Sequence, residues 1–335
     1  MDYLNESEEK ITDIQIIDRN NNIELSYAQQ RLWFIDQMDE GSSHYNTPGA
    51  MKVNGDFRVD IAQLAFTQII QRHEPLRTVF VNGDTGPSQV IRENFQFTIN
   101  ETDLRTLNRD AQQQAIEVAI TQDAQQAFDL SNDLMLRVSY LSISDDEGVM
   151  LFNMHHIASD GWSIGVMVAE FVKLYRSNLE GQPSPLTPLA IQYVDYAYWQ
   201  RNWLHGKVLN RQLNYWKKQL SNLPQVHSLP LDFERPTYQT FNGAKHGFKL
   251  DISILKQLKS IALENHATLF MLVHAAFSLL LSRYSNNTDI VIGTPVANRI
   301  KKELEPLIGF FVNTLVLRTD CSGNPGFLSF LEKIK

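Results

Sequence analysis

The sequence of 335 residues contains one cysteine, Cys321, and no apolar run long enough to span a membrane. A single thiol excludes an intramolecular disulfide and a zinc site built from cysteines, so the reducing cytoplasm is the expected location. The longest uncharged apolar stretch, residues 267–282, is shorter than the ~20 residues of a membrane-spanning helix. The N-terminal residues are acidic and polar, which is untypical of a secretory signal peptide.

Basic residues are outnumbered, and residues that break regular structure are few. Thirty lysines and arginines against 38 aspartates and glutamates give a net charge of −8, which argues against nucleic acid or a membrane as a partner. The 16 glycines and 12 prolines exclude a collagen-like or low-complexity chain. With 43% hydrophobic and 20% charged residues the composition is globular, and the length predicts about two domains at ~150 residues each.

Common catalytic and nucleotide-binding signatures are also missing. The sequence has no G-x-S-x-G nucleophile elbow, no G-x-x-x-x-G-K-[ST] loop and no G-x-G-x-x-G turn. These absences argue against a serine hydrolase of the elbow type and against the common phosphate-binding loops. A catalytic site in this chain must therefore be built from a less general pattern of residues.

Hydrophobic periodicity predicts alternating helices and strands, arranged in two α/β lobes. Residues 1–24 are expected to be a polar leader or linker, residues 25–178 the N-terminal lobe, and residues 190–335 the C-terminal lobe. Three prolines within residues 179–189 indicate the connection between the lobes. Ser26 is expected to cap a helix, the pair Asn82-Gly83 to close a hairpin, residues 221–245 to form a long loop, and residues 247–252 to form a strand.

One cluster carries the residue types of acyl-transfer chemistry. His155 and His156 follow a strongly apolar strand, and Asp160 and Gly161 precede a helix predicted to begin near Trp162. Because neighbouring residues on a strand point to opposite faces, only one histidine can face a given cleft. A helix N-terminus offers backbone N–H groups to a developing oxyanion, next to a neutral imidazole that accepts a proton.

Two other interpretations fit the same residues. Asp160 could serve only as the helix N-cap, with Gly161 as a turn residue and the histidines as ordinary strand-end residues. Alternatively, His156 and Asp160 could bind a metal ion, although no third ligand is evident nearby.

Six segments resemble, in order, the motifs of condensation domains of nonribosomal peptide synthetases, which favours the acyl-transfer interpretation. The histidine cluster, residues 154–163, is similar to the third motif. The others are residues 26–34 (SYAQQRLWF), 72–80 (RHEPLRTVF), 193–200 (YVDYAYWQ), 292–299 (IGTPVANR) and 308–318 (IGFFVNTLVLR). The seventh motif of the family, expected shortly after Lys335, is absent, so the resemblance implies a C-terminally truncated domain with an incomplete second lobe.

The resemblance implies a fold like chloramphenicol acetyltransferase, with two α/β lobes in a V-shaped pseudo-dimer. It implies amide bond formation between a donor acyl thioester and the amine of an acceptor aminoacyl thioester. Both substrates would be held on 4'-phosphopantetheine of partner carrier domains, beside an adenylation domain of the same synthetase, with no cofactor or metal on the domain itself. A silent carrier-docking module, a structural fragment and a metal-dependent hydrolase remain as alternatives.

Roles can be carried over from the family motifs to individual residues of this chain. His156 is expected to be the catalytic or substrate-positioning histidine, with His155 as its structural neighbour and the backbone of Gly161 near the reacting centre. Asp160 is expected to pair with an arginine, for which Arg299 is the first candidate and Arg77 the second. The motifs also imply supporting positions, which are expected at Trp162, Ser163 and Asn313.

Overall fold

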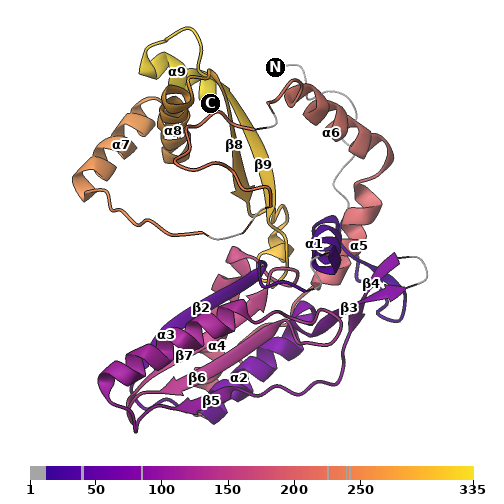
Figure 1. Cartoon of the computed structure of the whole chain (residues 1–335). Helices are drawn as coiled ribbons and strands as arrows, with labels where there is room; N and C mark the ends of the chain where they lie inside the picture. Colours follow the sequence, from indigo (N-terminus) through magenta and orange to yellow (C-terminus); the bar gives the residue numbers. More distant parts are fainter. Residues whose placement is uncertain (1–12, 39–40, 84–85, 225, 239, 241–242) are drawn as a thin grey trace. The chain divides into compact units, whose positions relative to one another are not determined.

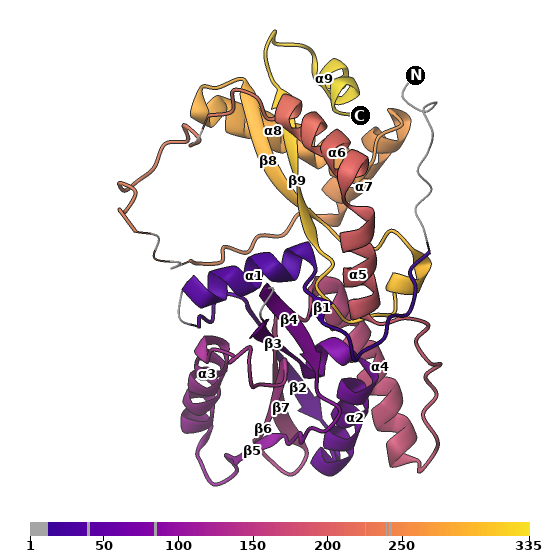
Figure 2. The same cartoon turned by 90° about the vertical axis from the view of Figure 1, so that its right-hand side faces the viewer.

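A computed structural model describes residues 13–38, 41–83, 86–224, 226–238, 240 and 243–335, and it divides into two compact units (Figures 1 and 2). Unit 1 extends to Leu209 and also includes Ala297–Asn313, whereas unit 2 consists of Asn210–Val296 and Thr314–Lys335. The boundary thus lies within helix α6 (Gly206–Gln219), and the connection expected at residues 179–189 lies inside unit 1. The difference arises because helix α5 (Tyr193–Trp203), which follows the prolines, packs in the core of unit 1.

Unit 1 is built on a four-stranded sheet with the order β2-β7-β6-β5. Its strands are β2 (Asn46–Asn54), β7 (Glu147–His155), β6 (Leu136–Ser142) and β5 (Asn100–Asp103). Only the β5–β6 pair is parallel. Strand β7 is central, and because helices cover both of its faces its sequence is an apolar run rather than an alternating one. His155 is the last residue of β7 and lies at the edge of the core.

Helices cover both faces of this sheet (Figure 2). On one face lie α2 (Val59–Arg72) and α4 (Gly161–Leu179), where Phe66 and Phe171 stack with ring centroids 4.5 Å apart. On the other face α3 (Arg109–Gln125) packs over Val149 and Leu151. Alternate residues of β7 therefore enter two separate apolar clusters, as the period of a strand requires.

A smaller sheet with the order β1-β4-β3 supports the N-terminal helix of unit 1. Its strands are β1 (Ile23–Glu24), β4 (Gly86–Ile91) and β3 (Thr78–Gly83), preceded by the short helix η1 (Glu74–Arg77). The antiparallel pairing of β3 and β4 confirms that a hairpin forms here, but Asn82 and Gly83 do not close it, because they are the last residues of β3 and pair with Pro87 and Gly86. The predicted cap is also confirmed, because the Ser26 hydroxyl accepts a hydrogen bond from Gln29 N–H at 3.1 Å at the start of α1 (Tyr27–Met38).

The described part of the predicted leader, residues 13–24, is packed on unit 1 rather than free of it. Ile14 and Ile23 are buried, and the Arg19 guanidinium forms ion pairs with Glu74, at 3.1 Å, and with the fully buried Asp195. Asp195 also accepts a hydrogen bond from Ile17 N–H at 2.9 Å. Residues 1–12 lie outside the described part of the chain, so the expectation of a leader there stays a prediction.

The described residues of unit 2 form the sheet β8-β9 and three helices besides the end of α6. Its elements are α7 (Ile252–Glu264), α8 (Leu269–Ser285), β8 (Asp289–Val296), β9 (Asn313–Asp320) and α9 (Phe327–Ile334). The strand predicted at residues 247–252 is wrong: residues 247–251 have no regular structure, Ile252 begins α7, and Phe248 and Leu250 are exposed. A short alternating run forms a strand only beside a pairing partner, and β8 and β9 pair with each other.

The segment 297–313 leaves unit 2 after β8, contributes the short helix η2 (Lys302–Leu304) to unit 1, and returns as β9. Between α6 and α7 the described residues form a long connection without helix or strand, as predicted. No single helix in the described residues is long and apolar enough to cross a membrane; α7 and α8 reach the required length and composition only together, across a bend of 103°.

We expect Gly49→Ala to lower the free energy of unfolding by about 1–3 kcal/mol, because an added Cβ would lie 2.1 Å from Cζ of Phe152 on the paired strand. Gly165→Ala in α4 is the matched control. No atom lies within 4 Å of its added Cβ, and alanine is favoured over glycine in a helix by ~1 kcal/mol. Chemical denaturation of both variants checks this. Equal denaturation midpoints for Gly49→Ala and wild type would contradict it.

Candidate active site

The loop that follows β7 separates the two neighbouring histidines. It is a tight turn, in which Ala158 N–H donates to the His155 carbonyl at 3.1 Å and Ser159 N–H donates to the His156 carbonyl at 3.3 Å. His155 is 1% exposed and its ring meets Phe128 edge-on, whereas His156 is partly exposed and its ring meets Phe310. The two side chains have different surroundings, as expected, but the turn separates them rather than strand alternation, because His156 lies just beyond the end of β7.

His155 is held as a neutral imidazole of one tautomer. Its Nδ1 accepts a hydrogen bond from Ile157 N–H at 3.1 Å, so Nδ1 carries no proton and the proton of the neutral ring is on Nε2. Burial, with smaller contributions from the nearby His156 and Arg137, lowers the pKa of His155 to about 3. His155 therefore supports the turn and does not exchange protons at neutral pH.

His156 has the opposite tautomer. Its Nδ1 lies 2.7 Å from the carbonyl oxygen of Ser159, and a carbonyl oxygen only accepts hydrogen bonds. Nδ1 must therefore carry the proton, which leaves Nε2 of the neutral ring unprotonated. The ring is further positioned by Phe310, whose centroid lies 4.9 Å away at an interplanar angle of 60°. This arrangement provides a fixed proton acceptor.

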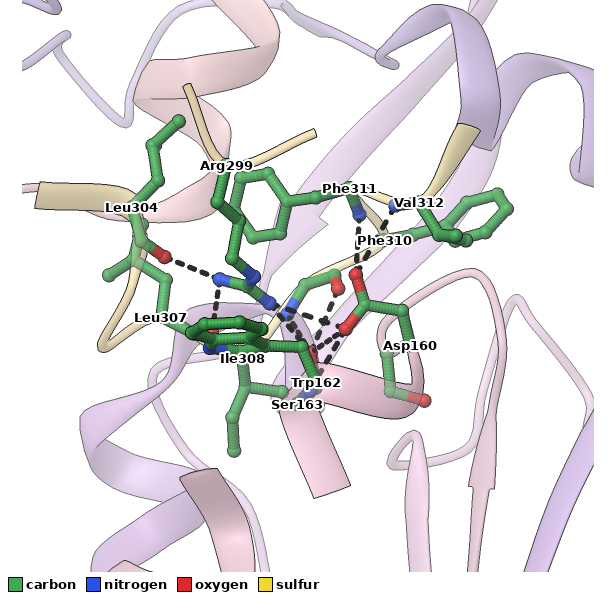
Figure 3. Close-up of polar contacts among 12 residues, drawn as sticks. Asp160, Trp162, Ser163, Arg299, Leu304, Leu307, Ile308, Phe310, Phe311 and Val312 are labelled. Carbon is green, nitrogen blue, oxygen red and sulfur yellow. Dashed lines mark hydrogen bonds and ion pairs between the residues drawn. The ribbon is translucent and has the colours of Figure 1, made fainter. Parts of the chain in front are cut away.

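The carboxylate of Asp160 is buried and fully used by hydrogen-bond donors (Figure 3). Oδ1 accepts from the backbone N–H of Ser163 at 2.9 Å, and thereby caps α4 as predicted, and from the Ser163 hydroxyl and Arg299. Oδ2 accepts from the N–H groups of Phe311 and Val312 at 3.1 and 3.2 Å. With these donors in place, neither oxygen is available as a base or as a metal ligand beside His156.

Arg299 is the partner of Asp160, and Arg77 is not. Arg299 Nη2 lies 3.3 Å from Asp160 Oδ1, and each of the two side chains is 2% exposed. Its Nη1 donates to the carbonyl groups of Leu304 and Leu307, and its guanidinium lies over the ring of Phe311. Burial lowers the pKa of Arg299, although Asp160 opposes the shift. Arg77 instead donates to the carbonyl of Arg92 at 2.8 Å.

Side chains from several motifs hold the irregular segment 308–312. Ile308 N–H donates to His73 Nδ1 at 3.3 Å, Gly309 contacts the Ser163 hydroxyl through both its N–H and its carbonyl, and the Phe310 carbonyl accepts from the Tyr193 hydroxyl at 2.7 Å. A Cβ on Gly309 would lie 2.1 Å from the Tyr193 ring, so no larger residue fits there. The segment is thus fixed by side chains rather than by strand pairing.

The other predicted residues lie at different distances from this cluster. Trp162 is half exposed, with its indole N–H on the Glu305 carbonyl at 2.9 Å, and Gly161 starts α4 in an exposed position. Asn313 is exposed at the first position of β9, directly after Val312. The structure therefore brings Ser163 and Trp162 to the Asp160–Arg299 pair, while the expected substrate contact of Asn313 stays a prediction.

Sequence reasoning missed several residues of the site. His73 and Tyr193 occur in the quoted motifs, but the motifs alone predict no role for them. Glu170, which accepts from His73 Nε2 at 2.8 Å, has a weaker signal. It occupies a position at helical spacing from Ser163, Met167 and Leu174, all buried, and an acidic residue on such a face needs a buried partner.

We expect wild-type stability to fall by about 2 kcal/mol between pH 7 and pH 5 through His155 alone. The folded-state pKa of His155 is about 3 and its ordinary value is 6.5, so the unfolded chain binds the proton first as pH falls through this window. His155→Asn keeps an acceptor for Ile157 N–H but does not titrate, so this part of the loss should disappear. Chemical denaturation at pH 7 and pH 5 measures the fall in the free energy of unfolding. His246→Asn, at an exposed position, is the control and should keep the wild-type pH dependence. An unchanged pH dependence in His155→Asn would contradict the prediction.

Removing the Asp160 charge should destabilise the fold far more than removing the His156 ring. Asp160→Asn leaves the buried Arg299 guanidinium unpaired, for an expected loss of about 3–5 kcal/mol in unfolding free energy. His156→Ala loses one side-chain hydrogen bond and the ring contact with Phe310, for an expected loss of about 1–2 kcal/mol. Equilibrium denaturation of both variants compares them. Similar losses would show that the ion pair has no special structural role.

Comparison with known proteins places these motifs in a family. The Condensation domain family model matches residues 19–335. The chain is 43% identical over 319 residues to one of the linear gramicidin synthase proteins of Brevibacillus parabrevis, with 95% of this chain and 6% of that protein covered. It is 39% identical over 336 residues to malpinin synthetase of Mortierella alpina, with 100% and 4% covered. The chain thus spans only a small part of these curated relatives.

Solved structures agree with the family assignment. The X-domain from teicoplanin biosynthesis has a TM-score of 0.83 at 26% identity, with 96% of this chain and 71% of that chain covered. The first condensation domain of the calcium-dependent antibiotic synthetase has a TM-score of 0.78 at 17% identity, with 94% and 72% covered, a likeness that concerns the fold alone. The predicted α/β condensation-domain fold is thereby confirmed, and the chain belongs to the Condensation domain family.

Proposed function

We propose that this chain forms an amide bond between a donor acyl or peptidyl thioester and the amine of an acceptor aminoacyl thioester, with His156 at the reacting centre. The observation that carries the proposal is the hydrogen bond from His156 Nδ1–H to the Ser159 carbonyl. It fixes Nε2 as the unprotonated nitrogen of a partly exposed ring. Membership of the Condensation domain family supports this reaction class.

Proton removal is one contribution of His156. An α-amino group has an ordinary pKa of ~7.7–8.0, so part of the acceptor amine is already neutral near pH 7. When the amine attacks the thioester carbonyl, its nitrogen gains positive charge and must lose a proton, which Nε2 can accept. The pantetheine thiolate leaves as the tetrahedral intermediate collapses. General-base assistance of this kind typically contributes ~10²–10⁴-fold to the rate.

The start of α4 is the proposed stabiliser of the oxyanion. The N–H groups of Gly161 and Trp162 precede the first intrahelical hydrogen bonds, and Asp160 caps the N–H of Ser163 instead. A bare carboxylate at this position would repel an oxyanion, but Arg299 neutralises it. Loss of one oxyanion donor typically costs ~10²–10³-fold in rate.

Positioning of the two substrates is proposed to supply most of the rate. Holding two reactants in line contributes up to ~7–11 kcal/mol, which exceeds either term above. His156 would then both orient the amine and remove its proton. A pH–rate profile without an ionisation in the histidine range would favour the positioning role over the role as base.

The proposed partners follow from the chemistry. The substrates are thioesters on 4'-phosphopantetheine, carried by separate donor and acceptor carrier domains, and an adenylation domain of the same synthetase would load the acceptor. The small fraction of its curated relatives that this chain covers supports a place in a larger synthetase. The cytoplasmic location predicted from the sequence stays a prediction.

We expect His156→Ala to lower condensation by about 10²–10⁴-fold if the base role dominates, and by less if positioning does. A donor carrier loaded with an acyl group and an acceptor carrier loaded with an amino acid are mixed with the protein. The mass of the acceptor carrier is followed, because amide formation adds the donor acyl group to it. The exposed His246→Ala is the matched histidine control and should transfer at the wild-type rate.

The assay is run with the 335-residue chain and with the larger synthetase. A mass gain that falls in His156→Ala but not in His246→Ala supports condensation at this site. A gain that both variants retain would place the chemistry elsewhere. No gain in either form, with several acyl groups, would overturn the proposal in favour of a silent carrier-docking module.

A further inference from the structure

A buried charged network lies behind the active-site loop and has no part in the chemistry proposed above. His73 is fully buried at the end of α2, and its Nε2 lies 2.8 Å from Oε2 of Glu170 in α4. Glu170 Oε1 accepts in turn from Arg72 Nε at 3.0 Å. A buried histidine without a structural or functional task would be an unfavourable choice for such a position.

The hydrogen bonds of His73 determine its tautomer. Ile308 N–H donates to Nδ1 at 3.3 Å, so Nδ1 is unprotonated and the proton is on Nε2, where Glu170 accepts it. Burial lowers the pKa of His73 despite the opposing effect of Glu170. Burial alone would raise the pKa of Glu170, but His73 and Arg72 outweigh it and the pKa is lowered. A neutral imidazole therefore links an ionised carboxylate to one backbone N–H.

This N–H group belongs to Ile308, the first residue of segment 308–312, and the same segment contacts the His156 ring. Ile308 is fully buried and has no strand partner, and two residues later the ring of Phe310 contacts the His156 imidazole. Ser163, Tyr193 and Asp160 bind the backbone of residues 309–312. The Leu307–Ile308 peptide group at the upstream end is held by His73 on its N–H and by Arg299 Nη1 on its carbonyl, at 2.9 Å.

We propose that His73 is a positioning residue for amide formation, which holds segment 308–312 through Ile308 N–H so that Phe310 keeps the His156 imidazole in place. The proposal rests on the proposed function. Glu170 fixes the tautomer that makes Nδ1 an acceptor, because its carboxylate requires the Nε2 proton. His73 does not touch the substrates, and its effect is transmitted through two residues of backbone and one aromatic contact.

Two substitutions separate the two bonds of His73. In His73→Asn the Oδ1 atom takes the place of Nδ1 and keeps an acceptor for Ile308 N–H, but the side chain is too short to reach Glu170. In His73→Gln the longer amide reaches Glu170 and loses the acceptor at the Nδ1 position. His73→Asn gives up the charge-assisted bond to the Glu170 carboxylate, and His73→Gln gives up the longer neutral bond from Ile308 N–H. The thermal unfolding midpoint should therefore fall at least as far in His73→Asn as in His73→Gln.

The carrier-transfer assay distinguishes the variants. We expect His73→Gln to lower kcat about 10–100-fold with the KM for each loaded carrier unchanged, because a displaced imidazole affects the transition state most. His73→Asn should stay within about threefold of wild type, because the contact to segment 308–312 is retained. Equal losses of kcat in both variants, or losses that follow the fall in their unfolding midpoints, would overturn the proposal. Unchanged kcat in His73→Gln would also overturn it.

A second readout does not depend on activity. In protein labelled at histidine, the ring signals of His156, identified by their absence in His156→Ala, report the nearby Phe310 ring through its ring current. They should move in His73→Gln and stay in place in His73→Asn. Unmoved His156 signals in His73→Gln would overturn the positioning role, whether or not the wild-type protein transfers an acyl group. Absence of acyl transfer by the wild-type protein would instead refute the proposed function.

Discussion

The Asp160 carboxylate is the interaction on which the rest of the site depends. It is 1% exposed, and a buried charge is tolerated only where a counter-ion and hydrogen-bond donors replace the lost water. Arg299, Ser163 and the N–H groups of Phe311 and Val312 supply them. Segments that are far apart in the sequence must therefore meet at one point, and the start of α4 is fixed as a result.

An ion pair of this kind adds little net stability compared with well-packed apolar residues, since desolvation offsets most of the attraction. The ion pair instead fixes the geometry of the segments that meet at Asp160. Each donor to Asp160 has one direction in which it bonds well, so the segment 308–312 can lie beside α4 in one register only. The ring of Phe310 and the turn of residues 155–159 are then set by the same network. This explains why a chain with so much apolar core keeps a buried arginine and aspartate together.

Some elements of this arrangement could be predicted from the sequence, and others could not. Three elements were predicted correctly: the helix after Ser26, the apolar strand before His155 and the helix near Trp162. The family motifs also gave Arg299 as the first candidate for the partner of Asp160, and the two residues do form a pair. The strand at residues 247–252 was wrong, because alternation is local while strand formation needs a partner. The packing of residues 13–24 was also missed, since only the fold brings Arg19 to Glu74 and Asp195. No local sequence pattern reveals that Ile308 N–H donates a hydrogen bond to His73.

The two adjacent histidines show how one short turn produces two chemical roles. In His155 a backbone N–H meets Nδ1, and in His156 a backbone carbonyl meets Nδ1, so their neutral tautomers are opposite. Burial removes His155 from titration at neutral pH, because the charged form would lie in an apolar region. His156 keeps a partly exposed ring with an acceptor nitrogen. At His156 both ring nitrogens have a role, because Nδ1 anchors the ring and Nε2 is left as the acceptor, whereas His155 needs only an acceptor at Nδ1. The turn that presents His156 therefore depends on a neighbour that takes no part in the proposed chemistry.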